Sequence, residues 1–97
     1  MIKIHVRTVG PIRRILDARE FDVTLAAGAT VESLFRHLIQ QYGHAFASLV
    51  TDSEGCIIAQ HIRVLVNGRD LFVLNDINTT LHDGDVVSMV SVIAGGV

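Results

Sequence analysis

Two adjacent glycines, Gly95 and Gly96, stand near the end of the sequence, in the stretch 92–97. Glycine has no Cβ, so it fits where no side chain would, and a chain end that no sheet or helix holds is normally mobile. These features predict a narrow thread with a carboxylate near its tip, able to enter a channel and present that carboxylate to an enzyme. A frayed end without a function explains the tail alone equally well.

The other residues that could do chemistry favour neither metal nor thiol catalysis. The histidines form no His-x-x-x-His pair and have no cysteine partner in sequence, so solvated side chains are the better interpretation. The single cysteine, Cys56, excludes an intramolecular disulfide and is interpreted as inert. No phosphate-binding glycine loop is present, so we expect no bound cofactor. The histidines are His5, His37, His44, His61 and His82.

Size and composition predict one cytoplasmic domain. The chain has 97 residues, of which 49% are apolar and 19% charged, which is enough for one hydrophobic core. The net charge of −2 predicts no general attraction to nucleic acid, and a small group of arginines in residues 7–19 does not change this. The start lacks the apolar run of a signal peptide, and no apolar stretch is long enough to cross a membrane.

The elements that would position the tail begin with two alternating segments. Residues 2–8 alternate apolar and polar side chains, as in a strand with one wet face, and residues 21–25 repeat this pattern. Between them, Gly10-Pro11 breaks the first strand, and residues 11–19 are interpreted as a connecting turn. The short link predicts an antiparallel hairpin.

A helix is predicted over residues 31–42. Its apolar side chains follow helical spacing, Thr30 is a good N-cap, and Gly43 is a plausible C-cap. Residues 44–60 stay open, although Phe46, Leu49 and Val50 could pack under the helix and residues 56–58 could form a short return strand.

The second half of the chain predicts further strands. Residues 62–66 form a strand that stops at Asn67-Gly68, the strongest hairpin signal in the chain, and a short strand follows. After the tight turn at residues 82–85, the last strand covers 86–92 and leads into the tail.

This order of elements predicts an α+β protein with the β-grasp (ubiquitin-like) fold. A mixed sheet of four to five strands would place the first and last strands side by side in parallel, with one main helix packed across the sheet. The domain would cover residues 1–92, and residues 93–97 would form a flexible Gly-Gly tail.

Several short motifs, in their order and spacing, resemble the ubiquitin-like sulfur carriers (MoaD/ThiS-type). The similarity is greatest to the small subunit of molybdopterin synthase and includes an insert at residues 52–58. The motifs are Ala29-Thr30-Val31 with Leu34, Val64-Leu65-Val66-Asn67-Gly68-Arg69-Asp70, Leu81-His82-Asp83-Gly84-Asp85-Val86-Val87, and Ile93-Ala94-Gly95-Gly96.

This resemblance implies a role for Gly96 in sulfur transfer for molybdenum cofactor biosynthesis. An E1-like adenylating enzyme would use ATP to activate the Gly96 carboxylate, and sulfur transfer would give a thiocarboxylate. The tail, with Gly95 giving access, would then enter the large subunit of molybdopterin synthase. A carboxylate at neutral pH is a poor electrophile, and adenylation supplies a good leaving group. The chain would therefore be a sulfur-donor subunit that supplies no acid, base or metal of its own.

Two departures from the family pattern stand near the tail. Many members carry proline shortly before it, where this chain has Ser91 and Val92, which makes the segment less stiff. In addition, Val97 follows Gly96 and would lock its carbonyl in a peptide bond. We therefore hypothesise that a peptidase removes Val97. A cloning remnant, or a relative that has lost the carrier role, would also explain this residue.

The last strand predicts a docking surface for partners. If Val87 and Met89 face the core, alternate side chains of this strand and of its neighbour face outward, beside the tail. Isolated surface valines, which need no explanation, are the alternative. The residues expected to contact a partner are Leu65, Val90, Val92, Ile93 and Ala94.

The destination of the sulfur stays open at this stage. Thiamine, cysteine, another thio-metabolite or tRNA could receive it in place of the pterin. A ubiquitin-like protein modifier, or a plain interaction module with the same fold, is the alternative from another class.

Overall fold

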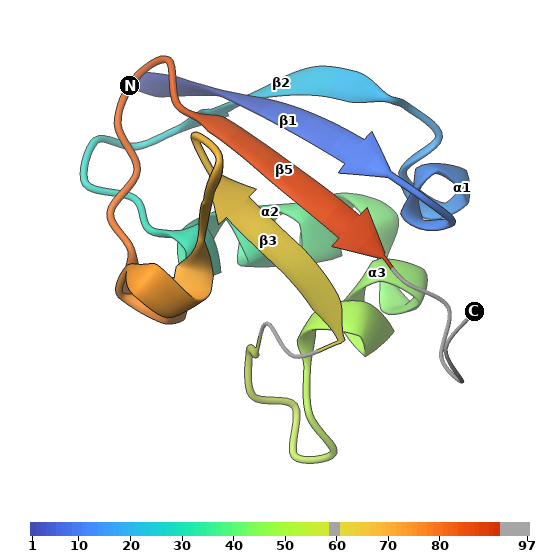
Figure 1. The fold of residues 1–97 in the computed structure, drawn as a ribbon. Helices are drawn as coiled ribbons and strands as arrows, with labels where there is room; N and C mark the ends of the chain where they lie inside the picture. The colour runs from blue at the N-terminus through green and yellow to red at the C-terminus, as the bar shows by residue number, and fades with distance from the viewer. Residues whose placement is uncertain (59–60, 92–97) are drawn as a thin grey trace.

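The computed structural model describes residues 1–58 and 61–91 of the chain. Within them, five strands form one mixed sheet in the order β2-β1-β5-β3-β4, so that β5 lies at the centre (Figure 1). The strands are β1 (Ile2–Val9), β2 (Glu20–Leu25), β3 (Ile62–Val66), β4 (Arg69–Asp70) and β5 (Val86–Ser91).

The pairing of β1 confirms both the predicted hairpin and the predicted parallel contact. β1 pairs antiparallel with β2, which places Ile4 opposite Val23, and parallel with β5, which places Val6 opposite Val87. All four side chains are buried, because alternation along each strand puts them on the same face of the sheet. The first and last strands of the chain are therefore neighbours.

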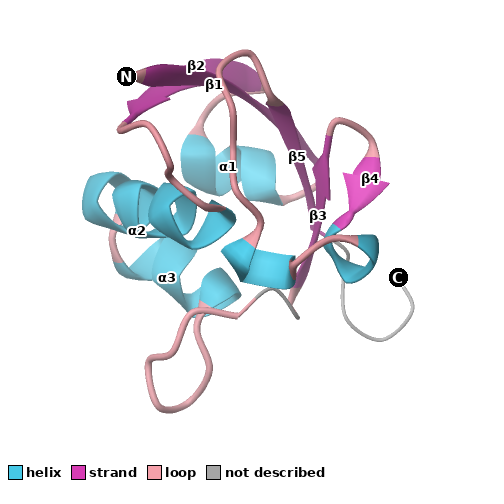
Figure 2. Ribbon diagram, turned by 90° about the vertical axis from the view of Figure 1, so that its left-hand side faces the viewer, coloured by secondary structure: helices cyan, strands magenta, loops and turns pink. Residues whose placement is uncertain are grey.

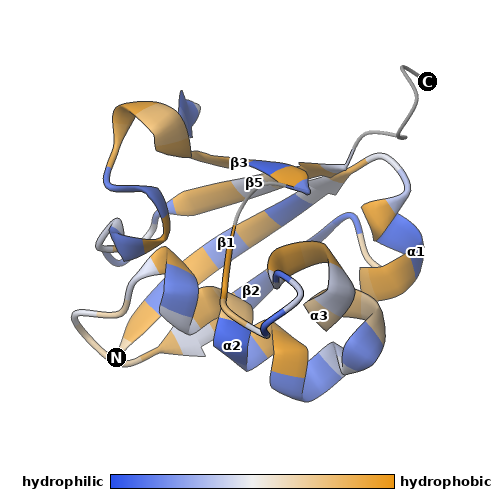
Figure 3. Cartoon of the chain, turned by 90° about the horizontal axis from the view of Figure 1, so that it is seen from below, coloured by the Kyte–Doolittle hydropathy of each residue, from blue (hydrophilic) through white to orange (hydrophobic). Residues whose placement is uncertain are grey.

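Helices cover one face of this sheet. Figures 2 and 3 show α2 (Val31–Tyr42) and α3 (His44–Val50) on the same side of the strands. The predicted helix over 31–42 is confirmed with its N-cap. The Ser33 amide donates to Thr30 Oγ1 over 3.3 Å, and Ser33 Oγ accepts from the Thr30 amide over 3.0 Å. This capping box satisfies two backbone donors that the first turn of a helix leaves free.

The connecting turn predicted over residues 11–19 is wrong in part, because Ile12–Leu16 forms a short helix, α1. Gly10 has φ +86° and Pro11 has φ −59°, so the chain reverses at the glycine and then enters the helical region. Ile12 and Leu16, four residues apart, both point into the core. A five-residue helix has little stability of its own, so burial of this pair holds it.

Residues 44–60, to which the sequence assigned no definite secondary structure, begin with α3. Phe46 and Val50 are fully buried, and the Phe46 ring meets Phe35 of α2 edge-on with 6.1 Å between ring centroids. The predicted packing of Phe46 and Val50 under the helix is confirmed, and Leu49 is partly buried against the same core. The return strand considered for residues 56–58 is a single bridge, between Thr51 and Ile57.

The predicted turn at Asn67-Gly68 is confirmed, since both residues have positive φ, +53° and +82°, as a two-residue hairpin between right-twisted strands requires. The short strand expected after it covers only Arg69–Asp70. Two 3₁₀ turns follow, η1 (Leu71–Val73) and η2 (Asp76–Asn78). In the described residues, no helix is of a length and hydropathy suited to crossing a bilayer.

Candidate functional site

The candidate site begins where β5 ends. β5 is the central strand and its last residue is Ser91, after which the chain continues directly toward Gly96. The predicted site residues at 92–96 lie outside the described residues: Val92, Ile93, Ala94, Gly95 and Gly96. Val97 and the end of the last strand predicted at residue 92 also lie there. The structure therefore shows the body from which the tail leaves.

A network of hydrogen bonds holds the start of β5. Asn67 donates its backbone N–H to the Val86 carbonyl over 2.7 Å, and its Oδ1 accepts the Val86 N–H over 2.9 Å. Asn67 Nδ2 also donates to Asp85 Oδ1 over 2.9 Å, while Asp85 Oδ2 accepts the His82 amide over 2.8 Å. The β3–β4 turn and the turn before β5 are thus joined, which fixes the register of the strand.

The face of the sheet opposite α2 and α3 carries the described part of the predicted docking surface. Figure 1 shows this open face in front of the helices. Val87 and Met89 are fully buried in the core, as the alternation predicted, and Val90 between them and the tail has the opposite orientation. Val90 and Leu65 are both half-buried, and neither is strongly exposed.

The neighbours of Val90 extend this apolar surface toward β1. Val90 lies between Val9 of β1 and Arg63 of β3, and Val9 is 46% exposed. Leu65 lies beside Ser88, two pairs further along the strands and so on the same face as Val90. Val9, Val90 and Leu65 therefore form a short apolar band on the open face, with the tail following directly after β5.

Sequence reasoning missed Phe72 and Val73, the most exposed large apolar side chains among the described residues other than Met1, at 94% and 73%. They follow β4 at the edge of the sheet, in a 3₁₀ turn whose first residue, Leu71, is buried. Three consecutive residues of such a turn point in different directions, so not all can face the core. An apolar run directly after a hairpin was the signal that could have found them.

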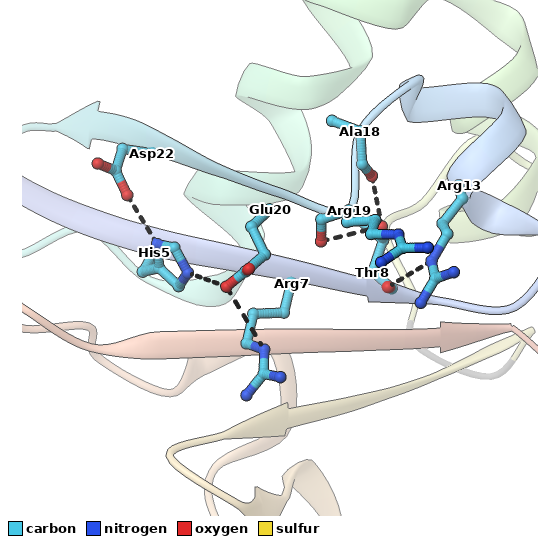
Figure 4. A network of polar contacts seen from close by, with 8 residues as sticks. All are labelled: His5, Arg7, Thr8, Arg13, Ala18, Arg19, Glu20 and Asp22. Carbon is cyan, nitrogen blue, oxygen red and sulfur yellow. Dashed lines mark hydrogen bonds and ion pairs between the residues drawn. The ribbon is translucent and has the colours of Figure 1, made fainter.

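A charged cluster that the sequence did not reveal lies on β1 and β2 (Figure 4). His5 Nδ1 lies 2.8 Å from Asp22 Oδ1, and His5 Nε2 lies 2.8 Å from Glu20 Oε1. Both ring nitrogens therefore face a carboxylate, and only the imidazolium can donate to both. Arg7 Nε adds a longer contact to Glu20 Oε1, at 3.8 Å.

This geometry shifts two pKa values in opposite directions. The hydrogen bond to Glu20, and then the one to Asp22, raises the pKa of His5 above its ordinary value, because both stabilise the charged ring. The hydrogen bond from His5 lowers the pKa of Glu20, with the nearby charges of His5 and Arg7 adding to the effect. The two carboxylates at the β1–β2 border of the open face therefore favour the charged form of His5.

The opposite border of the open face carries an ion pair. Arg63 Nε lies 2.9 Å from Asp70 Oδ2, and the Phe72 amide donates to Asp70 Oδ1 over 3.0 Å. The Phe72 amide, and then Arg63, lowers the pKa of Asp70. Charged groups thus flank the apolar band on both sides, an arrangement of apolar centre and polar rim that is common in protein interfaces.

The described residues contain no group of three or more His, Cys, Asp or Glu side chains arranged to hold a metal ion. Cys56 is exposed in the loop after α3. The candidate site therefore consists of the central strand β5, which the Gly-Gly segment follows in the sequence, and the partly apolar open face beside it.

The fold and this strand-to-tail arrangement define a protein of the ubiquitin-like β-grasp class. A profile described as the ThiS family matches residues 6–96, which is nearly the whole chain and ends at the second glycine. The chain belongs to the ThiS family.

Individual relatives support the same class. The chain is 30% identical over 95 residues to small archaeal modifier protein 3 of Haloferax volcanii, covering 98% of this chain and all of the relative. The solution structure of the HVO 2177 protein of Haloferax volcanii is similar, with a TM-score of 0.81 and 28% identity over 98% of this chain and 87% of that one. That of Urm1 from Trypanosoma brucei has a TM-score of 0.78 and 25% identity, over 97% and 95% of the two chains.

Proposed function

We propose that this protein is a sulfur carrier whose active group is the carboxylate of Gly96. The observation that carries the proposal is that the central strand ends at Ser91, shortly before Gly95-Gly96 in the sequence, within a family match that includes Gly96 and stops before Val97. A rigid body at one end and two residues without side chains at the other suit insertion into an enzyme's channel.

Adenylation and sulfur transfer take place at the carboxyl group of Gly96. Other proteins catalyse both steps. A carboxylate oxygen attacks the α-phosphorus of ATP, forming an acyl-adenylate and releasing pyrophosphate. Hydrosulfide supplied by the sulfur donor then attacks the acyl carbon and displaces AMP, and loss of the S–H proton leaves a thiocarboxylate. ATP binds to the E1-like adenylating enzyme, and this chain supplies the acyl group.

Val97 must be removed before this chemistry can begin. While Val97 is attached, the Gly96 carbonyl belongs to a peptide bond, so it has no free carboxylate to adenylate. A peptidase that hydrolyses the Gly96–Val97 bond supplies the required terminus, and the extent of the family match, residues 6–96, supports this step.

The proposed acceptor is the large subunit of a molybdopterin synthase-type complex. The motifs around the β3–β4 turn, before β5 and at the tail support this destination. Leu65 and Val90 contact the activating enzyme and the acceptor through the open face, while residues 92–94 lead the tail toward the active site.

The test of the carrier function uses a chain that ends at Gly96. This chain is incubated with the adenylating enzyme from the same organism, ATP and a sulfur donor, and its intact mass is measured. We expect replacement of one oxygen by sulfur at the terminus, and no reaction when Val97 is retained or when Gly96 is deleted. A correctly folded chain that forms neither adenylate nor thiocarboxylate would contradict the proposal.

The docking surface has a separate test in Leu65→Asp. A carboxylate in the apolar band loses its hydration on contact, so we expect the dissociation constant for the activating enzyme to rise by about tenfold or more. The matched control is Gln40→Asp, at an exposed position on α2, on the other face of the sheet. Equal affinities for the two folded variants, measured by titration calorimetry, would exclude this surface.

Protein modification is the second candidate function, favoured by the 30% identity to small archaeal modifier protein 3. It uses the same adenylate, but a lysine amine of a target protein attacks the acyl carbon in place of sulfur. Mass spectrometry of cellular proteins tests this function by searching for Gly-Gly remnants in isopeptide linkage to lysine. Such remnants, if they disappear on deletion of Gly96, would favour protein modification over sulfur delivery alone.

A further inference from the structure

The last described residue of β5 makes a side-chain contact that spans nearly the whole sequence. Ser91 Oγ accepts the backbone N–H of Ile12 over a distance of 2.8 Å. Ile12 is the first residue of α1, whose N-cap, Pro11, supplies no side-chain hydrogen bond. The first amides of a helix have no partner within it, so the Ser91 hydroxyl satisfies one of these free donors.

Gly10, two residues before Ile12, packs closely against the same residue. A Cβ on Gly10 would lie 2.6 Å from the Ser91 carbonyl oxygen and 3.2 Å from Ser91 Oγ. The first distance is shorter than any normal contact, so the backbone of Ser91 occupies space that only glycine leaves free. Ser91 therefore has two contacts with the β1–α1 turn, a hydrogen bond to Ile12 and close packing against Gly10.

The element that holds Ser91 is itself fixed to the body. Ile12 is fully buried and Leu16 almost so. Arg13 Nε also donates to the carbonyl of Thr8 on β1 over 3.1 Å (Figure 4). In Figure 1, α1 lies beside the end of the sheet where β5 finishes. A contact to α1 is thus a contact to a rigid part of the molecule.

We propose that Ser91 is a positioning residue, whose hydroxyl, with Gly10, fixes the direction in which the tail leaves the body. This inference rests on the proposed carrier function, because only a tail that enters an enzyme needs a defined starting direction.

The first test measures the tail direction without any enzyme. Spin labels are attached at Gln40→Cys, on the exposed side of α2, and at Val97→Cys, in a Cys56→Ser background, and the distribution of distances between them is recorded. Ser91→Thr and Ser91→Val form a matched pair, since their side chains have nearly the same shape and only threonine has a hydroxyl.

We expect the valine variant to broaden the distance distribution and the threonine variant to keep the width seen with serine. Equal widths for serine, threonine and valine would overturn the proposal. Amide hydrogen exchange at Ile12 reports the bond itself, and it should accelerate with valine and stay slow with threonine.

The second test uses the adenylation reaction of chains ending at Gly96. A body that presents the tail correctly only part of the time binds productively in proportion to that fraction. We therefore expect Ser91→Val to raise KM by on the order of threefold, the effect of one hydrogen bond, with kcat unchanged, and Ser91→Thr to restore KM. Ser48→Ala, which removes an exposed hydroxyl that bonds within α3, is the control and should change neither value.

The outcomes separate the two proposals. No adenylation of the serine chain contradicts the carrier function, while the label distances still decide the role of Ser91. Normal adenylation with the same KM for serine and valine retains the carrier function and rejects the positioning role.

Discussion

The two ends of β5 are held in different ways. At its start, Asn67 and Asp85 join two turns through several hydrogen bonds, and the His5 amide of β1 adds another to the Asp85 carbonyl over 2.9 Å. At its end, the side-chain hydrogen bond of Ser91 and the close approach of Gly10 fix the last described residue. The start of the strand sets register, and its end sets where the tail begins.

The two ends of β5 separate stability from function within one strand. The start of β5 is integrated into the β3–β4 turn, so damage there affects folding of the sheet. The end depends on a contact that few other residues share, so damage there should change tail presentation more than folding. Substitutions at the two ends should therefore have separable effects.

The largest effect is expected for Asp85→Ala. Asp85 is 15% exposed in its side chain, and its loss leaves Asn67 Nδ2 and the His82 amide without their acceptor. The free energy of unfolding should fall by about 1.5–3 kcal/mol, the range for a hydrogen bond to a charged group. Urea denaturation measures it, with Asp83→Ala as the control, because Asp83 is exposed and accepts one amide, from Lys3. An equal loss for both variants would contradict a special role for the start of β5.

Gly10→Ala should have a smaller effect on stability. The left-handed φ of +86° costs a non-glycine residue about 1–2 kcal/mol, and the contact with Ser91 adds to this cost. Gly28→Ala is the matched control, because Gly28 has φ +87° and nothing within 4 Å of its added Cβ. The excess loss for Gly10, measured by thermal or urea unfolding, reports the Ser91 contact, and no excess would show that the backbone moves aside freely.

The smallest effect concerns His5, which is paired with Val86 at the start of β5. Its raised pKa contributes stability that is present below its ordinary value of 6.5 and lost as pH rises through the folded-state pKa. The lowered pKa of Glu20 contributes stability that is present above 4.5 and lost as pH falls through its folded-state pKa. Wild type should therefore exceed His5→Gln in stability most clearly between pH 4.5 and 6.5.

Thermal unfolding across the pH range measures this difference. His44→Gln is the control, because His44 is exposed at the start of α3, and it should follow the wild-type curve. Parallel curves for wild type and His5→Gln would show that the cluster with Glu20 and Asp22 does not form in solution.

The features that sequence predicted are those with local causes. Alternation of apolar and polar residues predicted β1 and β2, the N-cap at Thr30 predicted α2, and Asn67-Gly68 predicted the β3–β4 turn. Each of these patterns acts within a few residues. The helix α1 was missed because burial, and not its own five residues, makes it helical.

The polar contacts of the site could not be predicted in the same way. His5 meets Glu20 and Asp22 only through the register of two strands, and Ser91 meets Ile12 across most of the chain. Such contacts depend on tertiary placement to within a fraction of an ångström. The chemical role of Gly96 stays a prediction from motif and family, because that residue lies outside the described structure.

The most direct test of the carrier account is the intact mass of this protein recovered from the cells that produce it naturally. The account predicts chains that end at Gly96, with a fraction carrying sulfur in place of one terminal oxygen. Recovery of only full-length chains ending in Val97, under conditions in which sulfur-dependent pathways are active, would contradict it.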